Sequence, residues 1–376
     1  MAAAAGFARG GPLTPPVGTV APTGRTLLEV EPRIPVGPAT TPGDANSVYR
    51  ITQPGSYYLI GNVQGVANKH GIVIAASDVT LDLMGFDVRG TYAGSGATAG
   101  GWYGVQVPAF AGIRRATVLN GTVSNWDGAG VGLASDGSLV QSVTAVACGL
   151  LGMGAGNGSS YVDCAAVQCA MGFNISPNST LSRCHAEAST GQGYILNQGN
   201  VLDACTAKGS GSHGFHAQSN TTFRACASYQ NAGDGFQVTN KSLLYGCNAY
   251  FNVQNGINAS GSTVIDCIAG SNTLSGIVAS GSCMVRGNTC DGNGNGGTGY
   301  GVSVTGSRNR IEANHCTGND QGINVSGAGN LIIRNSASGN SGFGYSIAAG
   351  NSFGPNVVPA GNQIATSTNP HSNYEF

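Results

Sequence analysis

Residues 193–238 read GYILNQGNVLDACTAKGSGSHGFHAQSNTTFRACASYQNAGDGFQV, and this stretch decides the fold. A quartet of Gly, apolar residue, any residue, apolar residue stands at GYIL, GFHA and GFQV, and successive copies begin 21 residues apart. The quartet recurs from residue 152 to residue 347 at gaps of mostly 20 to 22 residues. A fixed period of this length predicts a repeat architecture, because one such unit buries its apolar face only by stacking on its neighbours.

The quartets provide one apolar column along the stack. Their first apolar residues are Met153, Phe173, Tyr194, Phe215, Phe236, Ile257, Ile277, Val302, Ile323 and Tyr345, and earlier copies begin at Ile72, Val105 and Val131. Adjacent parallel strands lie about 4.8 Å apart, so equivalent residues stand directly above one another. We therefore expect about 13 turns and an inward stack of apolar and aromatic side chains.

A second column consists of Cys or Asn residues, each of which stands three positions after an apolar residue. This column holds Cys164, Cys184, Cys205, Cys226, Cys247 and Cys267, then Asn288, Asn314 and Asn335. Gly, Asn and Ser clusters between the two signatures tolerate tight turns and left-handed backbone. We expect an inward cysteine ladder that an asparagine ladder continues by hydrogen bonds along the column.

The repeat predicts an all-β fold, a single-stranded right-handed parallel β-helix over residues 46–355. A leucine-rich repeat would need an LxxLxL frame, which is absent, and a β-propeller would need a period of about 40 or more. Eight of the 14 prolines fall in residues 1–45, which predicts an irregular N-terminal segment, since proline cannot donate to a sheet ladder. Residues 356–376 are expected to form an irregular C-terminal tail.

These quartets, the apolar-x-x-Asn turn and the segment VTLDLMGFDVRG at 79–90 resemble right-handed parallel β-helix proteins of the pectate-lyase-like superfamily. The segments ITQPGSYYLIGNVQG at 51–65 and NPHSNYEF at 369–376 are similar to the ends of uncharacterised exported bacterial members. The superfamily includes polysaccharide lyases, glycoside hydrolases, sugar epimerases, phage tailspikes and surface proteins. The resemblance thus implies the fold and a polysaccharide partner, and leaves the activity open.

Composition narrows the classes of partner. The chain has 376 residues, 16 Lys and Arg, 17 Asp and Glu, and a formal charge of −1. Nucleic acids and anionic membranes require clustered basic residues, so neither is an expected partner. No apolar run approaches the roughly 18 residues that span a bilayer. The resemblance implies a secreted or cell-surface protein whose leader has been removed; a cytoplasmic protein is the alternative.

The eleven cysteines are interpreted as small apolar packing residues. They are few for so long a chain, and no CxxC or HxxxH spacing accompanies them, so neither a disulfide scaffold nor a zinc site is expected. An odd number of thiols argues mildly against export.

One candidate site lies on the outward face of the quartet strands. The residue before the Gly and the residue between the two apolar positions should face solvent. Across three consecutive turns these positions hold His213, His216, Asp234, Gln237, Asn255 and Asn258. Their amide, imidazole and carboxylate groups are able to hydrogen-bond sugar hydroxyls, whereas the alternative is an ordinary polar outer face.

A second candidate site lies near the Gly-rich insertion at 91–103. Insertions are where such proteins build grooves, and Trp102 and Tyr103 are able to stack on a sugar ring there. The alternative for Trp102 is that it covers the edge of the core.

The sequence supports catalysis less well than it supports binding. A glycoside hydrolase needs two carboxylates on one face, and this face offers only Asp234. A lyase needs a base, for which the candidates are His213 and Lys208, and a cation or Arg that neutralises a uronate, with Asp234 as a candidate calcium ligand. No three-carboxylate cluster for calcium accompanies them, so no cofactor is expected, with calcium left open.

A further set of acidic and basic residues follows the cysteine column. It comprises Asp163, Asp203, Asp266 and Glu312, interleaved with Arg183, Arg224, Arg286 and Arg334. We interpret these as solvated charges near a turn.

The sequence as a whole predicts an exported surface protein that recognises polysaccharide without strong catalysis. A polysaccharide lyase or glycoside hydrolase is the first alternative, and a self-associating scaffold is the second.

Overall fold

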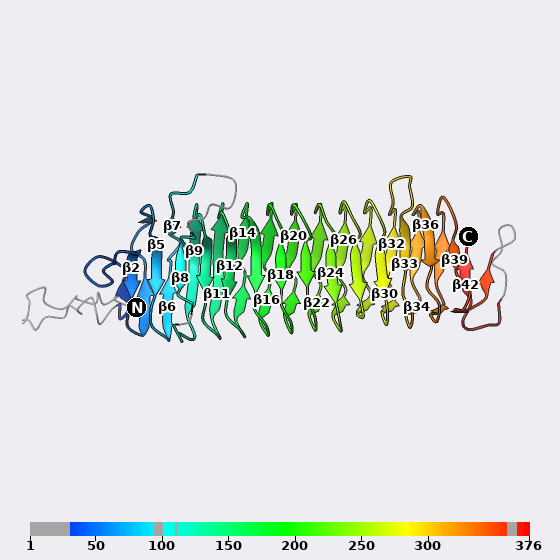
Figure 1. Cartoon of the computed structure of the whole chain (residues 1–376), viewed down its shortest axis with the longest axis horizontal. Coiled ribbons are helices and arrows are strands. Elements are labelled where there is room, and N and C mark those ends of the chain that lie inside the picture. The colour runs from blue at the N-terminus through cyan, green and yellow to red at the C-terminus, as the bar shows by residue number, and fades with distance from the viewer. Residues whose placement is uncertain (1–30, 94–100, 110, 359–366) are drawn as a thin grey trace, which may run out of the picture.

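The computed structural model describes residues 31–93, 101–109, 111–358 and 367–376. The chain winds into coils that stack along one long axis, and the colour runs from blue to red along the rod (Figure 1). A typical coil holds three short strands, each parallel to its equivalents in the coils before and after it. Residues 1–30 and most of the insertion, residues 94–100, lie outside the described part of the chain.

The quartets form a 14-stranded parallel sheet, here called sheet B. Its strands are β2 (Ser47–Ile51), β5 (His70–Ile74), β8 (Val105–Val107), β10 (Ala129–Leu133), β12 (Leu151–Ala155), β15 (Met171–Ile175), β18 (Tyr194–Leu196), β21 (Phe215–Ala217), β24 (Phe236–Thr239), β27 (Ile257–Ser260), β30 (Ile277–Ser280), β33 (Tyr300–Val304), β36 (Gln321–Val325) and β39 (Tyr345–Ile347). Each coil contributes one strand in unbroken register; Phe215, for example, pairs with Tyr194 on one side and Phe236 on the other.

The remaining strands form a 28-stranded sheet, here called sheet A, which most coils enter twice. The first strand of each coil belongs to the row β3 (Gly55–Tyr58), β6 (Val79–Asp82), β9 (Thr117–Ser124), β11 (Leu139–Val146), β13 (Ser160–Val162), β16 (Thr180–Ser182), β19 (Val201–Asp203), β22 (Thr222–Arg224), β25 (Leu243–Tyr245), β28 (Thr263–Ile265), β31 (Met284–Arg286), β34 (Arg310–Glu312), β37 (Leu331–Ile333) and β40 (Ser352–Phe353). The second belongs to the row β4 (Val63–Gln64), β7 (Asp87–Arg89), β14 (Ala165–Val167), β17 (His185–Glu187), β20 (Thr206–Lys208), β23 (Ala227–Tyr229), β26 (Asn248–Tyr250), β29 (Ile268–Gly270), β32 (Thr289–Asp291), β35 (His315–Thr317), β38 (Ser336–Ser338) and β42 (Asn373–Glu375). The long strands β9 and β11 span both rows, β1 (Ile34–Pro35) pairs with β3, and β41 (Asn356–Val357) pairs with β42.

The core confirms the expected inward aromatic stack. Phe173, Tyr194, Phe215 and Phe236 are fully buried. Successive ring centroids lie 4.8, 4.5 and 4.8 Å apart, and the planes are within 13° of parallel. The strand spacing of a parallel sheet imposes this separation, which suits stacked rings.

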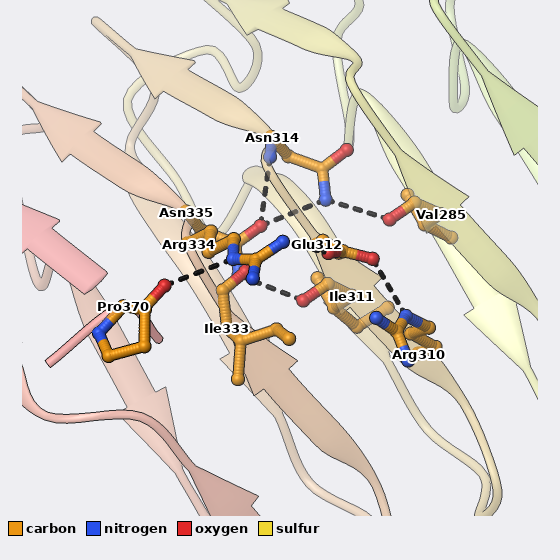
Figure 2. A network of polar contacts seen from close by, with 9 residues as sticks. All are labelled: Val285, Arg310, Ile311, Glu312, Asn314, Ile333, Arg334, Asn335 and Pro370. Atoms are coloured by element: carbon orange, nitrogen blue, oxygen red, sulfur yellow. Dashed lines mark hydrogen bonds and ion pairs between the residues drawn. The ribbon is translucent and has the colours of Figure 1, made fainter. Parts of the chain in front are cut away.

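The cysteine ladder and the asparagine ladder that continues it are also confirmed. All eleven cysteines are buried and free. The Asn288 side-chain oxygen accepts the Cys267 N–H at 2.9 Å, and Nδ2 of Asn288 donates to Oδ1 of Asn314 at 2.9 Å. The ladder runs on from Asn314 to Asn335 (Figure 2) and ends on Asn373.

Two more polar ladders, which the repeat pattern did not predict, stand at other corners of the coils. One is an asparagine ladder through Asn231, Asn252, Asn272, Asn293, Asn319 and Asn340. The other passes through Ser159, Ser179 and Asn200 and, further along, through Asn309, Asn330 and Asn351. Their amides satisfy backbone groups that the turns would otherwise leave buried without partners.

Two expectations need correction. The helix has about 15 turns rather than 13. One added coil contains β2, whose sequence lacks the leading glycine of the quartet, and β1 adds a further strand that pairs with β3 before it. The segment 356–376, expected to be irregular, contains β41 and β42, and β42 pairs with β38 to cover the end of sheet A. In the described ranges no helix is long and apolar enough to span a bilayer.

Candidate functional site

A groove of about 540 Å³ lies on the outer face of sheet B and runs across strands β8 to β15. Its floor lies at the position between the two apolar residues of the quartet, where Gln106 and Asn174 stand on the flanking strands. On β10 and β12 this position is occupied by Gly132 and Gly154, which carry no side chain to fill the space. Two consecutive glycines in one outward column therefore hollow the sheet surface.

Tyr103 forms one wall of this groove. Its ring lies across two glycines, since a Cβ added at Gly128 or Gly132 would approach the ring carbons to 2.5 or 2.6 Å. On the neighbouring strand the Leu151 side chain lies beside Gly154 in the same way. The glycines thus let a flat aromatic ring and a leucine rest on the sheet backbone, where they provide an apolar wall.

The polar lining of the groove is neutral. Among the described residues it comprises Tyr103, Gln106, Asn157, Asn174, Ser176 and Asn197, and no Lys, Arg, Asp or Glu side chain lines it. The amide of Asn197 is oriented by a hydrogen bond from Nδ2 to the Ile175 carbonyl at 3.1 Å. An aromatic ring beside amides and hydroxyls is suited to a neutral, hydroxyl-rich ligand.

The predicted His and Asp cluster forms on the same face of sheet B, but Asp234 is not exposed as expected. It retains only 2% exposure. Its Oδ1 accepts hydrogen bonds from the backbone and side-chain N–H groups of Asn255 at 3.0 and 2.9 Å, and its Oδ2 accepts from Asn258 at 3.0 Å. The two amides that were predicted to bind a ligand therefore cover the carboxylate and satisfy it.

His213 packs against this carboxylate in a defined tautomer. Its Nδ1 accepts the backbone N–H of Asp234 at 3.0 Å, and the same nitrogen lies 3.8 Å from Asp234 Oδ2. Because Nδ1 acts as an acceptor, the neutral ring carries its proton on Nε2. His213 can accordingly donate a hydrogen bond from Nε2, whereas accepting a proton there would require the tautomer to change.

His216 links this cluster to the groove side of the sheet. Its Nδ1 lies 3.1 Å from Nε2 of Gln192, and its ring centroid lies 5.9 Å from that of His213. Burial, with His213 as a second cause, lowers the pKa of His216 below its usual value. Gln237 stands beside His216 on the next strand, so the cluster forms one polar surface.

The two aromatic residues of the second candidate site, Trp102 and Tyr103, lie in different places. Tyr103 lines the groove, whereas Trp102 is partly buried against the core and lines a separate hollow of about 250 Å³. The Trp102 ring packs edge-on against His70 at 4.8 Å, and its backbone N–H donates to Asp127 at 2.9 Å. The alternative for Trp102, covering the edge of the core, matches this position.

Some of the acidic and basic residues beside the cysteine column form ion pairs along sheet A. Arg183 and Asp163 pair at 2.6 Å with both side chains well exposed, as solvated charges should be. Glu312 differs, because its side chain is 9% exposed and lies between Arg310 and Arg334 (Figure 2). The hydrogen bond and charge of Arg310, with the charge of Arg334, hold the pKa of Glu312 below its usual value. In the part of the chain that the structure describes, no three His, Cys, Asp or Glu side chains converge as metal ligands.

The groove itself was missed because its essential residues are glycines. Gly132 and Gly154 read in the sequence as ordinary members of a Gly-rich repeat. The available signal was the outward column, where Gly stands twice in succession between Gln106 and Asn174. A missing side chain in an otherwise filled column predicts a depression.

Comparison with known proteins supports the right-handed β-helix fold. A family model described as a right-handed beta helix region matches residues 104–262. The A-module of the mannuronan C-5 epimerase AlgE4 from Azotobacter vinelandii is similar in structure, with a TM-score of 0.57, 14% identity, and coverage of 80% of this chain and 90% of that chain. The A-module of AlgE6 from the same organism gives a TM-score of 0.53, 13% identity, and coverage of 85% and 89%. No curated protein sequence matches the chain.

Proposed function

We propose that this right-handed parallel β-helix of the pectate-lyase-like kind binds polysaccharide in the groove on the outer face of sheet B. The observation that carries the proposal is the groove floor, where Gly132 and Gly154 leave room beside the ring of Tyr103. A sugar ring has an apolar face that packs on an aromatic ring and a rim of hydroxyls that hydrogen-bond to amides. The groove supplies both kinds of partner in one depression.

The lining favours a neutral sugar. A uronate would need a cation to compensate its carboxylate on leaving water, and no cationic side chain is among the described residues that line the groove. Amides and hydroxyls exchange hydrogen bonds with sugar hydroxyls without that requirement. The structural neighbours support a polysaccharide partner and not its neutral charge, because both are named as epimerases of mannuronan, which is a chain of uronate units.

The surface formed by His213, His216 and Gln237 extends this site along sheet B. It begins beyond β18, whose outward residue Ile195 pairs with Asn174 of the groove on one side and with His216 on the other. A linear polysaccharide that follows the rod axis would cross the groove first and then these imidazoles. Nε2 of His213 provides a hydrogen-bond donor along that path.

The geometry favours binding over turnover. Asp234 is occupied by three N–H donors and shielded from water, and Nδ1 of His213 is already an acceptor. A general base needs a free acceptor within reach of the proton that it removes. A lyase or hydrolase remains the alternative function, and export to meet an extracellular polysaccharide is part of the proposal.

The test compares one substitution inside the groove with a matched one outside it. Gly154→Gln introduces a glutamine side chain into the groove. The equivalent position of β24 already holds a glutamine, Gln237. Val278→Gln makes the same change in the same column of β30, beyond the groove. Titration with maltohexaose, cellohexaose, laminarihexaose and mannohexaose should show binding by the wild type and by Val278→Gln, and a loss of at least tenfold in Gly154→Gln.

Three outcomes would overturn the proposal. Equal affinity in Gly154→Gln and the wild type would remove the groove as the site, and absence of binding to any glycan would favour a scaffold. Release of new reducing ends or unsaturated products would replace binding with catalysis. If Gly154→Gln fails to fold, Tyr103→Ala removes the wall without adding volume and should lose the same affinity.

A further inference from the structure

A further hollow lies on a different face of the rod, where strands of the second row of sheet A have their C-terminal ends. It measures about 550 Å³ and is lined by Lys208, Tyr229, Gln230, Tyr250, Phe251 and Ser271, here called the aromatic hollow. It lies near the middle of the rod, at the ends of β20, β23 and β26, of which β20 and β26 are labelled in Figure 1. None of these residues belongs to the groove on sheet B.

Phe251 has a backbone conformation that a bulky residue rarely adopts. Its φ is 57°, in the left-handed region, because the chain makes a tight turn after each second strand of sheet A. Equivalent turns hold Ala147, Gln168, Ala188, Gly209, Gln230, Ser271, Gly292, Gly318 and Gly339, all with φ between 52° and 63°. Phenylalanine is costly at such a position, where small or flexible residues serve elsewhere in the same rod.

The Phe251 side chain gains little burial that could offset this cost. It is 59% exposed. Strained backbone combined with an exposed apolar side chain is typical of positions kept for binding, since folding alone disfavours both. The ring lies 6.2 Å from that of Tyr250, at an angle of 36° between planes.

The Tyr250 ring lies flat on the backbone because the equivalent position of the next coil is Gly270, which has no side chain. A Cβ added at Gly270 would approach the Tyr250 ring to 2.7 Å, so the ring covers that glycine. The earlier strand holds Tyr229 in register with Tyr250, and Gly270 follows on the next strand. A ring with one face against the backbone presents its other face outward as a platform.

Polar groups surround this platform. Gln230 and Ser271 occupy the turns before and after Phe251, and both are exposed. The Lys208 ammonium is held at one edge by Glu187 at 3.0 Å, so its charge is already compensated. Aromatic faces with an amide, a hydroxyl and two phenols at their rim match a sugar ring better than an uncharged protein helix, which would offer few hydrogen-bonding groups.

We propose that the aromatic hollow is a second carbohydrate-binding site, in which a sugar ring stacks on Tyr250 and Phe251 and hydrogen-bonds to Gln230 and Ser271. A rod with two binding faces would hold separate glycan chains, or separate stretches of one chain. This inference is independent of the groove, because it depends on other residues and another face.

The test uses Phe251→Asn, which removes the ring and keeps a residue that tolerates left-handed backbone. Phe343→Asn is the matched control, since Phe343 is also an exposed phenylalanine, at 67%, and lies near the end of the rod. Titration with the four neutral hexasaccharides should give two sites for the wild type and for Phe343→Asn. Phe251→Asn should lose the aromatic-hollow site by at least tenfold and retain the groove site, whereas Gly154→Gln should do the reverse.

Unchanged stoichiometry and affinity in Phe251→Asn would overturn the inference. It would also fall if sedimentation showed that the wild type self-associates and Phe251→Asn does not, since a second copy of the chain would then be the occupant. If Phe251→Asn does not fold, Tyr250→Thr tests the same platform, because Thr317 stands at the equivalent position of a later coil. The groove proposal stands or falls separately, on Gly154→Gln.

Discussion

The ring of Tyr103 rests directly on Gly132, so that one added methyl group would lie 2.6 Å from two of its ring carbons. The pair joins a residue at the end of the 91–103 insertion to the outward column of sheet B. It explains why a glycine stands in the middle of a strand, where this residue is otherwise unfavourable. It also means that the groove wall depends on a contact that a small substitution would break.

Gly132→Ala is therefore expected to weaken glycan binding by about tenfold, or about 1.4 kcal/mol. The new methyl group would push the Tyr103 ring off the sheet and remove the wall of the groove. Gly37→Ala is the control, because a Cβ added at Gly37 meets no atom within 4 Å. Isothermal titration with the best-binding hexasaccharide measures the change, and equal affinity in both variants would contradict the assigned role of Tyr103.

Asn314→Ala is expected to destabilise the rod by about 3 kcal/mol, the cost of leaving buried hydrogen-bonding groups without partners. Asn314 Oδ1 accepts from both the backbone and side-chain N–H groups of Asn288, and its Nδ2 donates to Val285 and Asn335. Asn324→Ala, on the outer face of sheet B, should change little. Urea unfolding followed by circular dichroism compares them, and similar midpoints would refute a stabilising ladder.

Glu312→Gln tests the buried carboxylate between two arginines. Arg310 and Arg334 lower the pKa of Glu312 in the folded state. Its ionised form therefore stabilises the fold above the unfolded pKa, near 4.5, and this contribution is lost as the pH falls through the folded pKa. Since both arginines are nearly half exposed, we expect a difference of about 1 kcal/mol between wild type and Glu312→Gln at pH 7.

That difference should begin to shrink as the pH falls through the unfolded pKa, near 4.5, and should keep shrinking as the folded carboxyl, whose pKa is lower, takes up its proton. Thermal unfolding of both proteins from pH 3 to pH 8 measures it. A difference that stays constant across this range would show that the charge of Glu312 contributes nothing.

The thiols are expected to be unreactive in the folded protein. All eleven are buried, so a reagent in solution cannot reach their sulfur atoms, and burial is the main cause that raises the pKa of Cys226 well above its usual value. A disulfide reagent such as Ellman's reagent should label none within minutes at pH 7.5, and all eleven after unfolding in guanidinium chloride. Rapid labelling of the folded protein would place some of the cysteine ladder at the surface.

The periodic part of the fold could be predicted from sequence because stacking makes every coil repeat the same constraints. The Gly-apolar-x-apolar quartet placed Phe215 inside, and the apolar-x-x-Cys signature placed Cys226 in the ladder; both are fully buried. The coil of β2 was missed because its tyrosine strand lacks the leading glycine. The asparagine ladder through Asn252 was missed because asparagine is common in turns whether or not it points inward.

The candidate site was harder to predict, because it depends on contacts between coils rather than on residue type. Asp234 was placed in the correct column, yet Asn255 and Asn258 of the next coil cover it. The groove forms because Gly132 and Gly154 have no side chains that would fill it. A periodic pattern identifies which residues face outward, but not which of them are covered by neighbours.

A crystal structure with the most tightly bound neutral hexasaccharide tests the central claim most directly. The account predicts a sugar ring against Tyr103, above Gly132 and Gly154, with its hydroxyls hydrogen-bonded to Asn174 or Asn197. A structure in which that groove is empty while the sugar lies elsewhere on the rod would contradict it.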